Sequence, residues 1–485
     1  MVMRILWVLA AGVLACTKAP PHSDAVPGHA GEHEGDHAGA PRPVPKAPPK
    51  SVPPATTTLA FPGAEGFGAL ATGGRGGAVC TVTTLAKAGA GSLAACLAQN
   101  GPRIVVFRTS GVIEGPFELT HGDLTIAGQT SPGGITIKGG LVCDNVYDRN
   151  TCANLIIRHL RLRGGAPDSL RLGGTHDVIV DHVSFAAAED ENLEITRSQR
   201  ITVQYSVIAE PRGDHFKYGG VLINYSKDTM PLGDISLHHT VWNGVAGRLP
   251  ELSCEENADG PGKSNCVGRT LRIDLINNVM WDAVDPIWFN RCTGTNEGND
   301  CPVAATNMKL NLDLVGNILA RRSSGDDEAP LLEPHAFEGG NRIYAHDNVV
   351  LFGARRTEVA NVGQARSSAI TVTPTGTLLG HLAARAGAFP RDAMDVRLAG
   401  YLAKPIDTRA PAWRGDRGIE PTDAFTTAKA TTPPPLDTDE DGMPDAWETA
   451  HGLNPKIADA NTKGCAAEYT AIECYVNEVA DQVVR

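Results

Sequence analysis

The sequence predicts an all-β fold, a parallel β-helix in which short strands stack as successive coils of a solenoid. Short apolar segments recur from residue 100 to about 350, and the centres near Ile156, Ile179 and Thr202 follow one another at steps of 23 residues. The chain has 53 glycines and only 5% aromatic residues, which suits tight turns and short strands better than long helices. Coils with a period in the twenties must stack to bury their inner faces. A β-sandwich is the alternative, although its strands would be spaced about 8–12 residues apart.

The later coils are longer because loops are inserted between their apolar segments. Asn278, Asn317 and Asn348 take equivalent places in NNV, GNI and DNV, and this recurrence predicts a ladder of side chains at one turn. Long loops on one face of a solenoid would form the walls of a groove, which suits a polymer better than a small ligand.

The N-terminus has the features of an export signal. Arg4 supplies a positive charge, residues 5–14 are apolar but too few to span a bilayer, and VLAC ends at Cys16. This pattern is similar to a bacterial lipoprotein box, so we expect residues 1–16 to be a lipoprotein signal peptide with Cys16 lipidated. The protein would then be exported to the outer membrane or cell surface, attached to the membrane only by this lipid anchor. A plain secretory signal is the alternative and would make the protein secreted.

Residues 17–58 are rich in Pro and His and lack apolar periodicity, so we expect a disordered tether. Its histidines could collect a transition metal, but a soluble spacer is the simpler interpretation. The formal net charge of −12 argues against a nucleic-acid partner, because phosphate binding requires a basic patch.

Ten cysteines remain besides Cys16, and they fall into close sequential pairs without the CxxC spacing of a zinc site. Connectivity does not follow from sequence alone, but an oxidising compartment favours neighbours. The expected disulfides are Cys80–Cys96, Cys143–Cys152, Cys254–Cys266, Cys292–Cys301 and Cys465–Cys474.

The C-terminal region contains a calcium-loop motif. Residues 59–400 are expected to form the solenoid domain and residues 401–436, rich in Pro and Thr toward their end, a linker. The stretch LDTDEDGMPDAWETAHGLNP then supplies hard oxygen ligands at alternating positions around a glycine turn. We therefore expect an EF-hand-like structural calcium site and a disulfide-stapled tail in residues 437–485. The predicted ligands are Asp437, Asp439, Asp441, Asp445 and Glu448.

A second acidic stretch, DHVSFAAAEDENLEI at residues 181–195, places five carboxylates within fifteen residues. Asp190 and Glu194 are four residues apart, and Asp181 lies shortly upstream. Like charges crowded in a partly buried place disfavour ionisation, whereas calcium accepts such a set of oxygen ligands. Taken alone, the stretch is equally compatible with a solvated acidic loop.

Several longer stretches resemble the pectate lyases of polysaccharide lyase family 1. They include FPGAEGFGALATGGRGG (61–77), AGSLAACL (90–97), GPRIVVFRTSGVI (101–113), LTIAGQTSPGGITIKG (124–139) and VIVDHVSF (178–185), and the similarity covers roughly residues 60–350. The resemblance implies a right-handed parallel β-helix and calcium-dependent β-elimination of unesterified polygalacturonate by a monomer. The glycine-rich runs FPGAEGFG and GGRGG are interpreted as a segment that caps the N-terminal end of the solenoid.

The resemblance also assigns roles to individual residues. It implies that Asp181, Asp190 and Glu194 bind the catalytic Ca²⁺, that Arg248 in GRLPE is the general base, and that Lys217 in DHFKYGG contacts a substrate carboxylate. The base would take the proton from C5 of a galacturonate, which is α to the carboxylate. Calcium would stabilise the resulting charge.

One departure from the family pattern stands beside the expected base. The pectate lyases usually carry a further arginine just after the proline, whereas Glu251 and Ser253 stand at those positions here. Either another arginine, such as Arg269, Arg272 or Arg291, contacts the substrate, or the substrate is a different uronate polysaccharide. Two further hypotheses are a surface lipoprotein that binds glycan without cleaving it and a β-helix hydrolase with paired carboxylates.

Overall fold

The computed structural model describes residues 58–146, 151–212, 219–254, 268–290, 308–323, 330–337, 340–414, 417–426, 430, 433–465 and 468–484. Some of the predicted features lie outside these residues. They are the signal peptide with Cys16, nearly all of the tether, Lys217, Arg291, and the cysteines Cys266, Cys292 and Cys301. Within the described part of the chain, no helix combines the length and apolar character that a membrane span needs.

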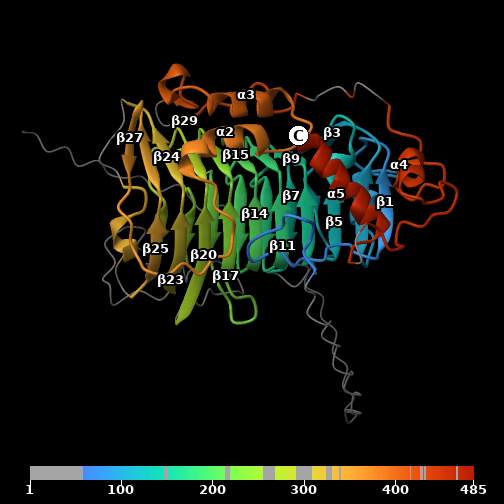
Figure 1. The fold of residues 1–485 in the computed structure, drawn as a ribbon, viewed down its shortest axis with the longest axis horizontal. Coiled ribbons are helices and arrows are strands. Elements are labelled where there is room, and N and C mark those ends of the chain that lie inside the picture. Colours follow the sequence, from blue (N-terminus) through green and yellow to red (C-terminus); the bar gives the residue numbers. More distant parts are fainter. Residues whose placement is uncertain are drawn as a thin grey trace, which may run out of the picture. The chain divides into compact units, whose positions relative to one another are not determined.

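Three sheets run side by side along the solenoid, and neighbouring strands in them are one coil apart, except for an antiparallel hairpin at the end of the second sheet (Figure 1). Sheet A comprises β1 (Ala78–Val82), β2 (Arg103–Phe107), β5 (Leu124–Ala127), β8 (Leu155–Arg158), β11 (His176–Asp181), β14 (Gln199–Gln204), β17 (Gly233–His238), β20 (Arg269–Ile276), β23 (Met308–Val315) and β25 (Arg342–His346). Sheet B comprises β3 (Gly111–Glu114), β6 (Ile135–Lys138), β9 (Leu160–Arg163), β12 (Ser184–Ala186), β15 (Val207–Ala209), β18 (Val241–Asn243), β21 (Val279–Trp281), β24 (Ile318–Arg321), β26 (Val349–Phe352) and β27 (Arg355–Glu358). Sheet C comprises β4 (Phe117–Glu118), β7 (Leu141–Asp144), β10 (Leu170–Gly173), β13 (Leu193–Thr196), β16 (Val221–Asn224), β19 (Glu251–Ser253) and β22 (Trp288–Asn290).

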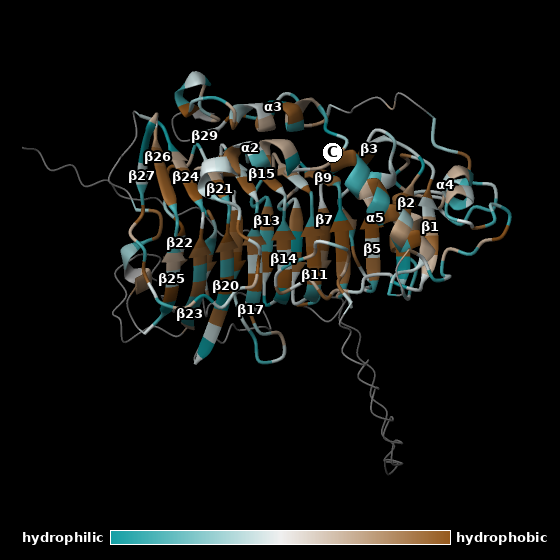
Figure 2. Cartoon of the chain, in the orientation of Figure 1, coloured by the Kyte–Doolittle hydropathy of each residue, from teal (hydrophilic) through white to brown (hydrophobic). Residues whose placement is uncertain are grey.

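The strand register confirms the coil period expected from the sequence. Ile179 pairs in parallel with Ile156 on one side and Thr202 on the other. Side chains alternate along each strand, so Val178 and Val180 point into the main hydrophobic core while Ile179 faces outward. Figure 2 shows the strands as predominantly hydrophobic. The protein is a right-handed parallel β-helix, as the sequence predicted.

The predicted asparagine ladder is present at one turn of the later coils. The amide N–H of Asn278 donates to Asn317 Oδ1 (2.9 Å), and that of Asn317 donates to Asn348 Oδ1 (2.9 Å). All three side chains are buried, and each bond satisfies a backbone donor that the turn would otherwise leave without a partner. The ladder fixes the stacking of successive turns.

The glycine-rich segment at residues 58–77 lies across the outer face of sheet A. The amide of Gly68 donates to Thr202 Oγ1 (2.9 Å), and a Cβ at Gly68 would stand 2.1 Å from the carbonyl oxygen of Val178. The amide of Gly74 similarly donates to Thr125 Oγ1 (3.0 Å). Glycine is therefore required because one backbone crosses another at close range. The interpretation of this segment as a cap on the solenoid end was wrong.

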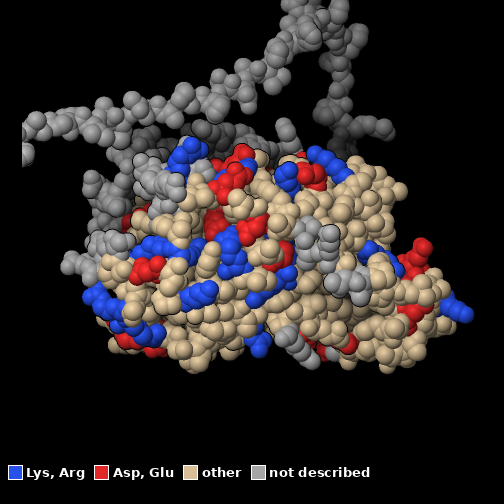
Figure 3. All heavy atoms as spheres, turned by 90° about the horizontal axis from the view of Figure 1, so that it is seen from above, with Lys and Arg blue, Asp and Glu red and all other residues tan. Residues whose placement is uncertain are grey.

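Two helices that were not predicted from the sequence cover part of sheet B, α2 (Thr375–Arg385) and α3 (Ala393–Tyr401) (Figure 1). Leu378, Leu398 and Leu402 pack against Val241 and Val279. The following stretch contains β28 (Trp413–Arg414) and β29 (Arg417–Gly418). Figure 3 shows acidic and basic side chains interspersed over the face seen from above.

The segment predicted as a linker, residues 401–436, is therefore packed against the solenoid over much of its length. Ile406 and Ala424 lie in the same hydrophobic cluster as sheet B. Arg163 on β9 pairs with Asp392 (2.6 Å) and Asp395 (2.9 Å), which attaches the start of α3 to the coils by buried ion pairs. The solenoid domain therefore extends beyond residue 400, because apolar side chains after this position pack on sheet B.

The C-terminal tail packs on the first coils rather than standing apart. It contains α4 (Asp445–Ala450) and α5 (Ala471–Val484). Met443 and Ile472 share a hydrophobic cluster with Ile104, Val106 and Ala127 of sheet A.

Three of the five expected disulfides are present among the described residues: Cys80–Cys96, Cys143–Cys152 and Cys465–Cys474. The first joins β1 to α1 (Leu93–Leu97), and the third holds the start of α5. Cys254 is also disulfide-bonded, but its expected partner lies outside the described residues.

Candidate active site

One line of outward-facing side chains crosses sheet C at equivalent positions of successive strands. Arg171 pairs in register with Glu194, Glu194 with Leu222, Leu222 with Glu251, and Glu251 with Trp288. The residues on either side of Glu194, Leu193 and Ile195, point into the main core. Alternation along the strands therefore presents charged and aromatic groups together on the outer face of this sheet.

Three carboxylates meet just before the middle strands of this sheet. Asp168, Glu191 and Glu194 each offer an oxygen within 4.8 Å of the others, and all three side chains are buried. The amide of Glu191 donates to Asp168 Oδ1 (3.1 Å), one coil of 23 residues away. Arg171 Nη2 lies 3.1 Å from Glu194 Oε1. The cluster brings three acidic side chains together beside Arg171 on sheet C.

Burial and mutual repulsion oppose ionisation of this cluster. Burial raises the pKa of the Glu194 carboxyl, and the nearby Asp168 carboxylate raises it further while Arg171 lowers it. Burial likewise raises the pKa of Asp168. Asp168 Oδ2 is buried and accepts no hydrogen bond from the described residues. A bound divalent cation would coordinate this oxygen and favour the ionised carboxylates.

Arg248 lies two coils beyond Glu191, and its guanidinium is ion-paired with two carboxylates. Its Nη1 contacts Glu191, and its Nε donates to Glu251 Oε2 (2.8 Å). The side chains of both acids are nearly fully buried. Glu251, the residue that replaces the usual arginine, therefore holds the expected base. This contact was not anticipated from the sequence, which showed only that Glu251 stands where the family usually carries an arginine.

The structure corrects one of the expected calcium ligands. Asp181 ends β11 in sheet A, whereas Glu194 lies in sheet C. Both Asp181 oxygens are engaged, because Oδ2 accepts from Arg158 Nε (2.8 Å) and Oδ1 accepts from Gln204 Nε2 (2.8 Å). Burial alone would raise the pKa of Asp181, but His182 and Arg158 hold it well below its usual range. Asp181 is a structural ion-pair partner, and Asp168 takes its place beside Glu194.

Asp168 could have been found from the period already recognised in the strands. A step of 23 residues carries position 168 to 191, and position 171 to 194. The family motif directed attention to Asp181 instead, because that acid adjoins the recognisable VIVDH segment.

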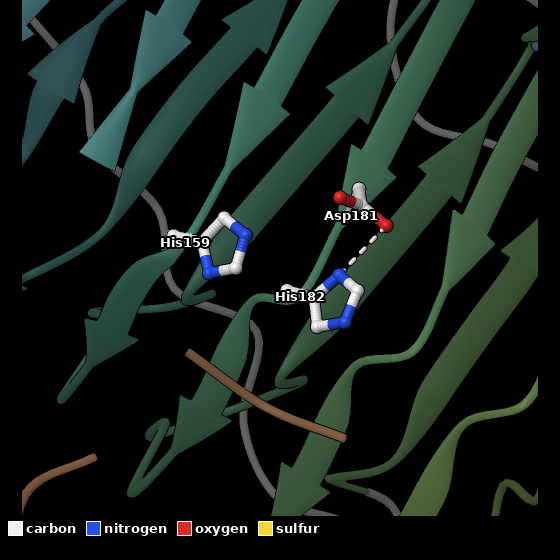
Figure 4. Close-up of side chains that lie close together, drawn as sticks. All are labelled: His159, Asp181 and His182. Carbon is white, nitrogen blue, oxygen red and sulfur yellow. Dashed lines mark ion pairs between the residues drawn. The ribbon is translucent and has the colours of Figure 1, made fainter. Parts of the chain in front are cut away.

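His159 and His182 also approach Asp181, as Figure 4 shows, and the three could be taken for a metal centre. The two imidazoles are stacked, with ring centroids 4.8 Å apart and planes within 10°. Nitrogen lone pairs lie in the ring plane, so two parallel rings cannot direct them at one ion. Tyr205 and His239 extend the same stack on the next coils. This column is a stacking ladder at the corner between sheets A and B.

The remaining expected site residues have mixed outcomes. Asp190 lies close enough to Asp168 to raise its pKa, so it belongs to the acidic cluster region. Arg269 and Arg272 belong to β20 in sheet A, away from sheet C, and pair with Asp228 and Asp234. They are therefore not the arginines that replace the missing substrate contact.

The C-terminal calcium motif forms a second acidic cluster. Oxygens of Asp437, Asp439 and Asp441 lie within 4.8 Å of one another, and so do those of Asp441, Glu448 and Asp459. Burial and the neighbouring acids raise the pKa of Glu448 to about 7. Asp459 was missed because it lies outside the twelve-residue motif.

Asp445, expected at the ninth position of the motif, does not join this cluster. Its two oxygens accept hydrogen bonds from the amide and the hydroxyl of Thr438 (2.7 and 2.6 Å).

Comparison with known proteins gives a consistent result. Probable pectate lyase C of Emericella nidulans is 28% identical over 458 residues, which cover 88% of this chain and 94% of that protein. The chain is similar to this probable pectate lyase over most of its length. Probable pectate lyase C of Aspergillus oryzae matches at 28% identity with similar coverage, and that of one Aspergillus fumigatus strain reaches 39% over 175 residues, 34% of this chain and 40% of the fungal protein. No family model matches the chain.

Solved structures of pectate lyases resemble the chain more distantly. The thermostable pectate lyase PL 47 covers 69% of this chain and 99% of its own at 15% identity, with a TM-score of 0.46. A pectate lyase bound to hexasaccharide covers 70% and 99% at 13% identity, also with a TM-score of 0.46. The strand pairing within the chain itself, rather than these likenesses, establishes the parallel β-helix.

Proposed function

We propose that this protein is a polysaccharide lyase that cleaves unesterified polygalacturonate by calcium-dependent β-elimination. The observation that carries the proposal is the juxtaposition on sheet C of three buried carboxylates, Asp168, Glu191 and Glu194, with Arg248. The pectate lyases to which the chain is related give the substrate class. A uronate polymer carries one carboxylate on each sugar, so a site that gathers carboxylates of its own would bind it through a cation.

The acidic cluster fits a calcium ion. Its ligand atoms are hard carboxylate oxygens, and Asp168 Oδ2 accepts no hydrogen bond from the described residues, with Arg171 Nη1 4.0 Å away. Asp168, Glu191 and Glu194 would hold the ion, with Asp190 close by. When bound, calcium supplies a Lewis acid that stabilises negative charge developing on the substrate carboxylate.

The remaining chemistry belongs to side chains of the chain. Arg248 would accept the proton from C5, as the resemblance implies; its guanidinium would first have to lose a proton to solvent and release Glu191. Glu191 is both a member of the acidic cluster and a partner of Arg248, so engagement of Glu191 by a cation would weaken one of the two ion pairs. Glu251 remains on Nε and orients the guanidinium. Arg171 is placed beside Glu194, where it could meet a sugar carboxylate.

The double ion pair of Arg248 also favours a second candidate, a protein that binds glycan without cleaving it. A guanidinium held by two buried carboxylates is positioned to neutralise them rather than to give up a proton. On this hypothesis the cation site would bind the polymer, and the chemical step would be lost.

The location of the protein is proposed to be extracellular. Three disulfides among the described residues fit an oxidising compartment. The N-terminal sequence supports a lipoprotein of the outer membrane or cell surface, with Cys16 as the lipid anchor and residues 17–58 as a tether.

The decisive experiment follows absorbance in the near ultraviolet while purified protein meets polygalacturonate at pH 8–9. β-Elimination forms a C4=C5 double bond conjugated to the carboxylate, so absorbance should rise with calcium and cease with excess chelator. Arg248→Ala should abolish the rise, whereas Arg269→Ala, which changes an arginine in sheet A, should leave it intact. New reducing ends without absorbance would indicate a hydrolase. Calcium-dependent binding of polymer without either signal would support the binding protein.

A further inference from the structure

We propose that the C-terminal acidic cluster binds a calcium ion through Asp459 in place of Asp445, and that this ion fastens residues 437–484 onto the first coils of the solenoid. The proposal does not depend on lyase activity. It concerns a site on sheet A, whereas the candidate active site lies on sheet C.

The arrangement of acids departs from the twelve-residue loop that the motif predicts. Both oxygens of Asp445 are occupied by Thr438, so this residue closes the loop internally. Asp459 lies 11 residues beyond Glu448 in the chain, yet its carboxylate comes within 4.8 Å of Asp441 and Glu448. Asp441 belongs to both groups of three acids and therefore joins them.

Several of these oxygens are buried without a hydrogen-bond partner among the described residues. Glu448 is fully buried, and neither of its carboxylate oxygens accepts a hydrogen bond. Asp437 Oδ1 and Asp459 Oδ1 are likewise buried and accept no hydrogen bond from the described residues. Burying a carboxylate without hydrogen bonds or a counter-charge is strongly unfavourable. A cation with several oxygen ligands compensates for this, and calcium accepts six to eight such ligands with flexible geometry.

The cluster connects the loop at residues 437–442 with the segment after α4, and the loop packs against sheet A. The amide of Asp459 donates to Asp441 Oδ2 (3.0 Å), so the loop and the segment after α4 are already in contact. Gly442 has φ +94°, and a Cβ there would stand 2.6 Å from Val79 Cγ1 on β1. Arg108, which follows β2, pairs with Asp437 (3.4 Å). The acidic loop is thus built directly against the first two strands.

Helix α5 carries the attachment further along the solenoid. Glu473 pairs with Arg75 (2.7 Å), and Gln129 Nε2 donates to the carbonyl oxygen of Val476 (3.1 Å). Arg158 Nη1 donates to Asn477 Oδ1 (3.0 Å). Since α5 begins soon after Asp459, an ion that fixes Asp459 also fixes the start of this helix. Metal binding to such a cluster is then coupled to the folding of the tail.

The test uses calcium chloride and a full-length parent variant, Glu194→Gln, in which the sheet C cluster is weakened. Calorimetric titration of the parent should show one calcium site. Adding Asp459→Asn should raise its Kd at least about tenfold, as expected for loss of a ligand, whereas the matched Asp445→Asn change should alter Kd by less than about threefold. Equal effects of the two substitutions, or a larger effect of Asp445→Asn, would overturn the assignment of the ligands.

Hydrogen exchange tests the fastening itself, without relying on any variant that might fail to fold. In the unsubstituted protein, calcium should increase protection of peptides from residues 437–484 and from β1, and chelator should remove it. If calcium binds but leaves the exchange of α5 and β1 unaltered, the ion is not a fastener and the proposal is refuted.

Discussion

The replacement of Asp181 by Asp168 in the candidate calcium site yields the most direct prediction. Two matched variants, Asp168→Asn and Asp181→Asn, each remove one buried negative charge while keeping the side-chain shape. Asp168 offers an oxygen within 4.8 Å of Glu191 and Glu194, so its loss removes a direct ligand. A unit charge at about 4 Å contributes about 4 kcal/mol at an effective dielectric constant of 20. The substitution also removes the ion pair between Asp168 and Arg171, which offsets part of this energy. We therefore expect calcium affinity at the sheet C site to fall at least about 100-fold.

Asp181→Asn should behave in the opposite way. It leaves the guanidinium of Arg158 buried without its carboxylate, which costs about 3–5 kcal/mol of stability. Calcium affinity at sheet C should stay unchanged. The assay is calorimetric titration with calcium in a Glu448→Gln background, which weakens the C-terminal cluster, combined with denaturant unfolding. A loss of calcium affinity in Asp181→Asn, with Asp168→Asn unaffected, would refute the assignment made from the structure.

Three further predictions test other parts of the molecule. Glu251→Gln should lower the KM for polygalacturonate severalfold, because it removes a negative charge beside Arg248. The control Glu189→Gln changes an exposed carboxylate and should leave KM unaltered. An unchanged KM in Glu251→Gln would show that Glu251 does not face substrate. Burial raises the pKa of Asp274 from 3.8 to about 6, so ionisation of this carboxyl destabilises the folded state as pH rises from about 4 to 6. Asp274→Asn should therefore increase the free energy of unfolding by up to about 3 kcal/mol above pH 6 and change it little at pH 4. Denaturant unfolding at each pH measures this difference. Gly68→Ala should destabilise the fold by at least about 2 kcal/mol, because the new Cβ meets the backbone oxygen of Val178 at 2.1 Å; a neutral result would mean that the segment shifts freely on sheet A.

The coils could be predicted from the sequence because their signals are local and repeated. Alternating apolar residues identify strands, and the step from Ile156 to Ile179 gives the length of a coil. The recurring NNV, GNI and DNV segments identified a ladder whose hydrogen bonds the structure contains. The helices α2 and α3 were not foreseen, because their burial depends on sheet B being there to receive them.

The candidate site could be predicted only in part. Asp190, Glu194 and Arg248 were found through the family motif, and the structure brings Glu194 and Arg248 to one face around Glu191. Asp181 was misplaced because a motif records neighbours in sequence, and a residue at the corner between two sheets points away from the third. The role of Glu251 required the ion pair itself.

Spacing along the chain is enough to account for the stacked-coil architecture, the three disulfides seen among the described residues and the presence of two acidic clusters. It fixes what each coil buries, and in an oxidising compartment it favours pairing of neighbouring cysteines without fixing it. Which acids share a site is settled by contacts between distant segments. Asp168 meets Glu191 because two coils stack in register, and Asp459 meets Glu448 because the tail folds back on itself. The 23-residue period indicates the first of these contacts once the strands are known to stack. The second depends on long-range closure of the tail, which no local pattern encodes.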